Sequence, residues 1–205
     1  MHFSSAKKSR LLFSFCLDPS WPSVLTIGLL AVMMALVSVA SVPESIAWFG
    51  VGFAELMLAI AIIDWRHFII PDRLNATAFA LGLAQVWWQD PQDPLVALAT
   101  ALARGAVLAA AFWALRFCYQ RIRGREGLGF GDVKLAAVAG VWLGWSMLPL
   151  AVEIAAVSAL AFYGLRQVIL SESWSGSSRI PFGMFLAIAV WLTWMFENTT
   201  LLCCP

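Results

Sequence analysis

Residues 46–64 read IAWFGVGFAELMLAIAIID, an almost continuous apolar run that ends in an acid. A helix needs about 20 such residues to cross the hydrocarbon core of a bilayer. Across the whole chain of 205 residues, 61% are hydrophobic and only 12% are charged. Soluble domains carry roughly 25% charged residues. We therefore predict an all-α fold, a polytopic membrane bundle of helices.

Seven apolar segments are candidates for the helices of this bundle. The third is short, and a tight turn near Pro149 is expected to join the fifth to the sixth. We divide the chain into residues 1–45, a cytoplasmic N-terminus with a first anchor, and a membrane core, residues 46–202. A cleaved signal peptide ending near Ala40 is the alternative for the first segment. The predicted spans are residues 24–42, 46–63, about 75–88, 95–119, 133–150, 151–170 and 182–202.

The basic residues sort to one side of the membrane if these spans simply alternate. Cytoplasmic loops are rich in Lys and Arg, so the N-terminus is predicted inside and the C-terminus outside. Arg104, inside the fourth span, is the one basic residue left out of this sorting, and the opposite side holds acids alone: Glu44, Asp90, Asp93 and Glu197. The basic side holds Lys7, Lys8, Arg10, Arg66, Arg73, Arg116, Arg121, Arg123, Arg125, Lys134, Arg166 and Arg179.

Composition argues against several classes of function. A net charge of +1 gives no basis for nucleic-acid binding, and two histidines are too few for a histidine metal cage. The four cysteines form no C-x-x-C pair, so neither metal nor cofactor is expected. Tryptophans near span ends suggest an interfacial belt. They are Trp21, Trp48, Trp65, Trp87, Trp88, Trp142, Trp145, Trp174 and Trp194.

Two acids at the ends of apolar segments are the main functional candidates, Asp64 and Asp132. Asp132 follows three alternating glycines in the run GLGFGDVKL, residues 127–135, and could instead be the N-cap of a helix. Asp64 closes its helix, where an acid is unfavourable. A solvated contact with Arg66 or His67 is the structural explanation for it.

Four other charged groups have simpler explanations. Asp72 follows a proline and could cap the third span, although a role in shaping a site is also open. Arg104 is expected to pair with Glu55, Glu153 or both inside the bundle. A proton or ion pathway through these three groups is the competing interpretation.

A pair of carboxylates at the membrane edge could hydrolyse a peptide bond without a metal. Two close carboxylates cannot easily both ionise, so they share a proton. The ionised one can take a proton from water, and the protonated one can donate to the carbonyl or the leaving amine. Whether the two acids meet in space is a hypothesis at this point.

Three blocks of this sequence resemble the type IV prepilin peptidases, which are GxGD-type membrane aspartic proteases. The first is residues 63–72, an acid followed by Pro71-Asp72; the second is residues 127–135, with GxGD at 129–132. The third is the IPFG of residues 180–183. The order, spacing and expected topology of the family also match over about residues 46–202.

The resemblance implies that Asp64 and Asp132 are the catalytic pair. It further implies a bacterial inner-membrane enzyme that cuts the leader from type IV prepilins, pseudopilins or Flp-type prepilins on the cytoplasmic side. The partners expected are therefore the substrate helix and the lipid bilayer. The remaining residues of the three blocks are expected to shape the site: Gly129, Gly131, Lys134, Pro71, Asp72, Pro181 and Gly183.

Two departures from the family pattern stand out. Larger members also methylate the new N-terminus through a cytoplasmic domain with two C-x-x-C pairs. Only residues 43–45 separate the first two predicted spans here, so we expect a short form with peptidase activity alone. Met184 also stands after Gly183 where many members have proline.

Two readings from other classes compete with the peptidase. A small transporter or channel would use Glu55, Arg104 and Glu153 and would not need the aspartates. An inactive relative would bind pilins without cutting them, and its binding would survive loss of both aspartates.

Overall fold

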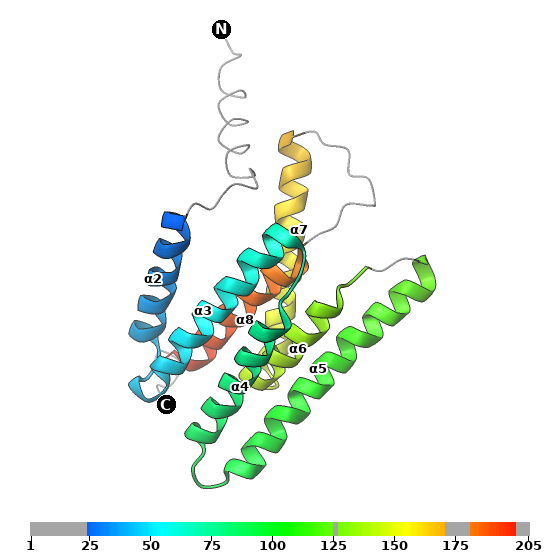
Figure 1. Cartoon of the computed structure of the whole chain (residues 1–205). Coiled ribbons are helices and arrows are strands. Elements are labelled where there is room, and N and C mark those ends of the chain that lie inside the picture. The colour runs from blue at the N-terminus through cyan, green and yellow to red at the C-terminus, as the bar shows by residue number, and fades with distance from the viewer. Residues whose placement is uncertain (1–23, 125–126, 171–180, 200–205) are drawn as a thin grey trace.

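The computed structural model describes residues 24–124, 127–170 and 181–199, and these residues form helices joined by short connections (Figure 1). Successive helices run in alternating directions, so that α3, α5 and α7 end where α4, α6 and α8 begin (Figure 1). We call this the upper end of the bundle. The helices are α2 (Val24–Ser41), α3 (Glu44–His67), α4 (Asp72–Gln89), α5 (Pro94–Arg123), α6 (Phe130–Trp142), α7 (Met147–Leu170) and α8 (Phe182–Asn198).

Three of the described helices are long and apolar enough to cross a membrane. They are α3, α5 and most of α7, whose apolar part runs from Met147 to Val168. The helices α2 and α8 are apolar but shorter over their described residues. The expected all-helical membrane protein is confirmed at this level.

The boundary between the fifth and sixth predicted spans was wrong. The chain turns at residues 143–146, and Pro149 lies in the first turn of α7. Proline is tolerated there because the first amides of a helix have no intrahelical acceptor. The carbonyl of Gly144 accepts hydrogen bonds from Met147 and Leu148, at 3.0 and 3.2 Å. These bonds start α7 before the proline, and α6 has only 13 residues.

Aromatic side chains organise the centre of the bundle. The ring of Trp142 stacks on Phe53 at 3.7 Å, and Trp194 meets both rings edge-on. Trp142 also donates a hydrogen bond of 2.8 Å to the carbonyl of Ala78 on α4. It lies so close to Gly82 that a Cβ there would meet its Nε1 at 2.6 Å. The membrane belt predicted for Trp142 and Trp194 was therefore wrong.

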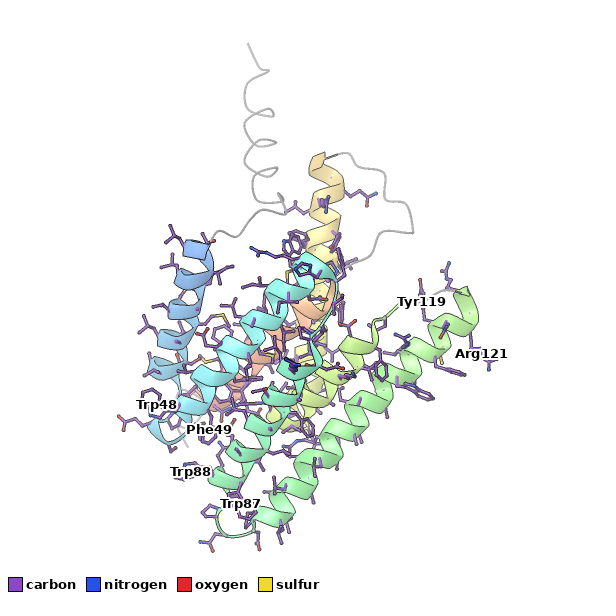
Figure 2. All side chains as sticks on the ribbon, viewed as in Figure 1. Trp48, Phe49, Trp87, Trp88, Tyr119 and Arg121 are labelled. Carbon is purple, nitrogen blue, oxygen red and sulfur yellow. The ribbon has the colours of Figure 1, made fainter. Side chains whose placement is uncertain are left out.

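Other tryptophans do lie on the outside. Trp48, Trp87 and Trp88 are exposed and gather at the lower end of the bundle, opposite Tyr119 and Arg121 (Figure 2). Aromatic side chains of this kind suit the membrane interface, because their rings are apolar and their N–H groups need water.

The expected pairing of Arg104 with Glu55 or Glu153 was wrong. Arg104 Nε donates a 3.1 Å hydrogen bond to the carbonyl of Gly140, where α5 crosses α6. The acid that interacts electrostatically with Arg104 is Glu197, at the end of α8. Glu153 is exposed on α7, and no ion pair joins either acid to Arg104 within the described ranges.

Candidate active site

Asp64 lies in the last turn of α3 and is buried, with 5% of its surface exposed. Its Oδ2 accepts a hydrogen bond of 2.8 Å from the backbone N–H of Met184, the third residue of α8. The free amides at a helix N-terminus carry partial positive charge, which offsets the unfavourable end of α3. Burial and this contact replace the solvated interaction with Arg66 or His67 that was the alternative.

Asp132 is also buried, with 7% of its surface exposed. It is the third residue of α6, not the N-cap, because Gly129 occupies that position. Its Oδ2 accepts a 3.1 Å hydrogen bond from the N–H of Gly129. Such a bond back to the cap residue stabilises the first turn of a helix. The helix thus fixes the carboxylate, and the expectation that Asp132 only caps the helix is corrected.

The structure brings the two aspartates together around Gly183 of α8. A Cβ built on Gly183 would lie 2.9 Å from Oδ2 of Asp64 and 3.0 Å from Oδ1 of Asp132. The two oxygens therefore lie at most about 6 Å apart, a separation that a single water molecule can bridge. Gly183 leaves this gap open because it has no side chain. Pro181, which is buried, is the residue from which α8 starts.

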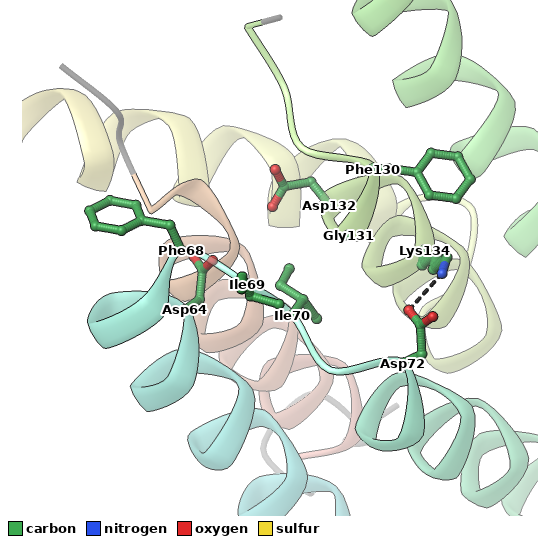
Figure 3. Close-up of a pocket in the computed structure, with 9 residues that line it drawn as sticks. All are labelled: Asp64, Phe68, Ile69, Ile70, Asp72, Phe130, Gly131, Asp132 and Lys134. Atoms are coloured by element: carbon green, nitrogen blue, oxygen red, sulfur yellow. Dashed lines mark hydrogen bonds and ion pairs between the residues drawn. The ribbon is translucent and has the colours of Figure 1, made fainter. Parts of the chain in front are cut away.

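The aspartates face an open pocket of about 240 Å³ at the upper end of the bundle (Figure 3). The carboxylates of Asp64 and Asp132 point toward one another, and the connection from α3 to α4 runs from beside them toward Asp72 (Figure 3). In the described ranges, no three acidic, histidine or cysteine side chains come together in a way that could hold a metal ion. The lining residues are Asp64, Phe68, Ile69, Ile70, Asp72, Phe130, Gly131, Asp132 and Lys134.

Asp72 does not cap α4, contrary to one expectation. It is the first residue of that helix, and Pro71 precedes it as the N-cap without a side-chain hydrogen bond. Its carboxylate forms an ion pair of 2.6 Å with Lys134 Nζ, which joins the start of α4 to α6 (Figure 3). Lys134 also lies 5.1 Å from the ring centre of Phe130. The pair forms one wall of the pocket.

Electrostatics set Asp132 apart from an ordinary surface acid. Burial raises the pKa of Asp132, the negative charge of Asp64 raises it further, and the hydrogen bond from Gly129 lowers it, with a result of about 7. Among the described residues, neither aspartate forms an ion pair. A group with this pKa can exchange a proton near neutral pH, as acid catalysis requires.

The roles of three residues in the site were not predicted from the sequence. Ile70 is buried against Gly131, where an added Cβ would meet its Cβ at 2.9 Å, so the second glycine of the GxGD block allows close packing. Phe68 adopts a left-handed backbone, with φ of 55°, at the end of α3. Met184 contributes only its backbone N–H. An apolar side chain gives no sequence signal for any of these roles.

The two aspartates of the site lie within a region that matches a known protein family. A family model described as the type IV leader peptidase family matches residues 51–165, which contain both aspartates. No solved structure matches the chain.

Curated relatives match about 70% of the chain. A prepilin leader peptidase/N-methyltransferase of Burkholderia pseudomallei (strain 1026b) is 35% identical over 149 residues, which is 71% of this chain and 45% of the relative. Proteins of the same name from Stutzerimonas stutzeri and Pseudomonas aeruginosa are 34% and 33% identical over 142 residues, 69% of this chain and 47% of each. The chain thus spans about half the length of the curated relatives it matches.

Proposed function

Since this chain belongs to the type IV leader peptidase family, we propose that it is a membrane aspartic endopeptidase that removes the leader peptide of a prepilin. The relatives are named as prepilin leader peptidases, which supports this class of substrate. The observation that carries the proposal is the juxtaposition of Asp64 and Asp132 around Gly183 beside an open pocket.

This geometry suits hydrolysis by an activated water molecule. One carboxylate takes a proton from water while the water oxygen attacks the carbonyl carbon of the peptide bond. The other carboxyl group gives its proton to the carbonyl oxygen. When the tetrahedral intermediate collapses, the C–N bond breaks and the leaving nitrogen takes the proton that came from water. The second carboxylate recovers its proton from a hydroxyl of the intermediate, so one water molecule is consumed.

The proposed orientation places the pocket at the cytoplasmic face of the bacterial inner membrane. The upper end of α5 carries Arg116, Arg121 and Arg123, and Lys-rich and Arg-rich ends favour the cytoplasm. All seven described helices would then lie in or across the membrane, with the N-terminus inside. A substrate with a cytoplasmic leader and an apolar helix would present the junction between them to this pocket.

The substrate is a prepilin, a pseudopilin or an Flp-type prepilin in this proposal. The other residues of the three blocks would shape the site: Gly129 and Gly131 by letting Asp132 and Ile70 approach, and Gly183 by leaving room between the acids. Asp72 and Lys134 would hold the pocket wall, and Pro71 and Pro181 would start their helices. No methylation of the product is proposed, because two residues alone separate α2 from α3.

The test is cleavage in membranes of one prepilin from each substrate class, followed by mobility shift and mass of the new N-terminus. We expect the parent to cleave at least one, and Asp64→Asn to cleave none at normal expression. The matched controls are Glu55→Gln and Glu153→Gln, which also remove an acid from a helix but lie outside the pocket. Both controls should cleave normally, and the new N-terminus should be unmethylated.

The alternative results refute the proposal in distinct ways. Cleavage by Asp64→Asn would show that the aspartate is structural. Loss of function only in the Glu55→Gln and Glu153→Gln variants would favour a transporter or channel. Failure of the parent on every class, with binding retained, would favour a protein that binds pilins without cutting them.

A further inference from the structure

The two aspartates differ in the backbone groups that contact them. Asp64 accepts a hydrogen bond of 2.8 Å from Met184, and the preceding amide of Gly183 also interacts favourably with its carboxylate. Among the described residues, Asp132 accepts one longer bond of 3.1 Å, from Gly129. A carboxylate that accepts more amide hydrogen bonds is stabilised more strongly in its charged form.

Nearby side chains do not reverse this difference. Among the described residues, Asp132 of α6 and Tyr163 of α7 interact electrostatically with Asp64, and Arg166 of α7 acts on that tyrosine. Lys134 and Asp72 line the same pocket, and their 2.6 Å ion pair neutralises both charges within the pocket wall. The amides at the start of α8 are therefore the main groups that favour one charged aspartate over the other.

We infer that the aspartates have fixed roles, with Asp64 the ionised base, Asp132 the protonated acid, and the backbone N–H of Met184 the positioning group that maintains this assignment. This inference rests on the proposed peptidase function. Asp64 would take the proton from water and later give it to the leaving nitrogen. Asp132 would protonate the carbonyl oxygen and recover a proton from the tetrahedral intermediate, so that both carboxyl groups return to their starting states.

Met184 can serve this role because of its place in α8. The N–H of the third residue in a helix has no intrahelical acceptor, so it is available to Asp64. Proline has no N–H and is tolerated in the first turn of a helix. Met184→Pro therefore removes the donor at a position where the helix does not depend on it.

The experiment is the pH dependence of kcat/KM for a prepilin that the parent cleaves, measured for Met184→Pro and Met184→Leu. Met184→Leu keeps the N–H, so both limbs of its profile should lie at the same pH as in the parent, whatever its absolute rate. In Met184→Pro the acidic limb should move to higher pH by about one unit, since the lost N–H no longer stabilises ionised Asp64 and water recovers only part of that stabilisation. The alkaline limb should stay in place.

The position of the shift decides between role assignments. In the inferred assignment Asp64 is charged both before and after Asp132 loses its proton, so loss of the donor leaves the alkaline limb unchanged. If Asp132 were the base, the alkaline limb would move and the acidic limb would not. Identical profiles for Met184→Pro and Met184→Leu would also overturn the inference.

A second way to remove the N–H covers the case in which Met184→Pro does not fold, and the activity of the parent separates the two hypotheses. If Met184→Pro does not fold, an ester in place of the Gly183–Met184 amide removes the same N–H without a ring, and the same shift is expected. If the parent cleaves no prepilin, the proposed function fails. If the parent cleaves and the acidic limb does not move, the role assignment alone fails.

Discussion

Buried acids accept hydrogen bonds from backbone amides at both ends of the bundle, but the two ends differ in the charged groups around those acids. At the lower end, Glu197 accepts hydrogen bonds of 3.1 and 3.2 Å from the N–H of Gly144, and it attracts Arg104 of α5. At the upper end, Asp64 and Asp132 face each other across the pocket, and within the described ranges no cation forms an ion pair with either.

This difference separates an acid with structural contacts from the two acids that we propose are catalytic. Glu197 has an amide and a cation to satisfy its charge, and its bond fixes the turn between α6 and α7. The two aspartates can both carry a negative charge, and holding like charges close together lowers the free energy of unfolding. Unfavourable charge pairs beside an open pocket are typical of catalytic sites.

Asp132→Asn should break the unfavourable pair and stabilise the protein. In the folded protein the pKa of Asp132 is raised from 3.8 to about 7, so its stabilising contribution is complete below about pH 4 and is lost as pH rises toward about 7. Asn does not ionise and avoids this loss. The free energy of unfolding of Asp132→Asn in detergent should therefore exceed that of the parent by an amount that grows from about pH 4 to about pH 7, up to about 4 kcal/mol.

The control for this comparison is Glu153→Gln, an exposed acid on α7. Its unfolding midpoint should follow that of the parent at every pH. A pH-independent difference between Asp132→Asn and the parent would contradict the strained pair at the upper end.

Gly183→Ala should separate the two carboxylates. The new Cβ would lie 2.9 and 3.0 Å from their oxygens and would meet the tip of Ile70 at 2.5 Å. Misplacement of reacting groups by about 1 Å can cost about 100-fold in rate, so we expect kcat/KM for prepilin cleavage to fall by that order. Gly164→Ala is the matched control, because nothing lies within 4 Å of a Cβ there. Equal activity of the two variants would show that the gap at Gly183 is not needed.

Lys134→Met should have the smallest effect. Its ion pair with Asp72 is partly exposed, and such pairs contribute about 0–1 kcal/mol, so kcat/KM should fall by less than about fivefold. Asp72→Asn should give a similar loss, and the double variant should lose no more than either. A loss for Lys134→Met as large as that for Asp64→Asn would place Lys134 at the reacting atoms instead of the pocket wall.

The sequence predicted most helices because apolar length and sorted charges carry that information. It placed the ends of α2, α3, α4 and α5 within a few residues. It failed between α6 and α7, because Pro149 looked like a helix breaker while the carbonyl of Gly144 starts the helix earlier. It also assigned Trp142 to the interface, since a buried stacking partner such as Phe53 cannot be recognised from position along the chain.

For the site, too, some features were predicted from the sequence and others were not. Both aspartates were found because acids at the ends of apolar segments are costly. Their contact at Gly183 and the amide of Met184 could not be found, because each depends on α8 packing against helices far away in the sequence. The partner of Arg104 was missed for the same reason, since it is a backbone carbonyl of α6.

The central claim is that Asp64 and Asp132 act as one unit, and a double-mutant comparison tests it most directly. Rates of prepilin cleavage would be measured for Asp64→Asn, Asp132→Asn and the double variant. Residues that act as a unit have losses that do not add. We expect each single variant to lose at least about 1000-fold, and the double variant to lose no more than either. Partial activity in each single variant, with losses that multiply in the double variant, would contradict the account.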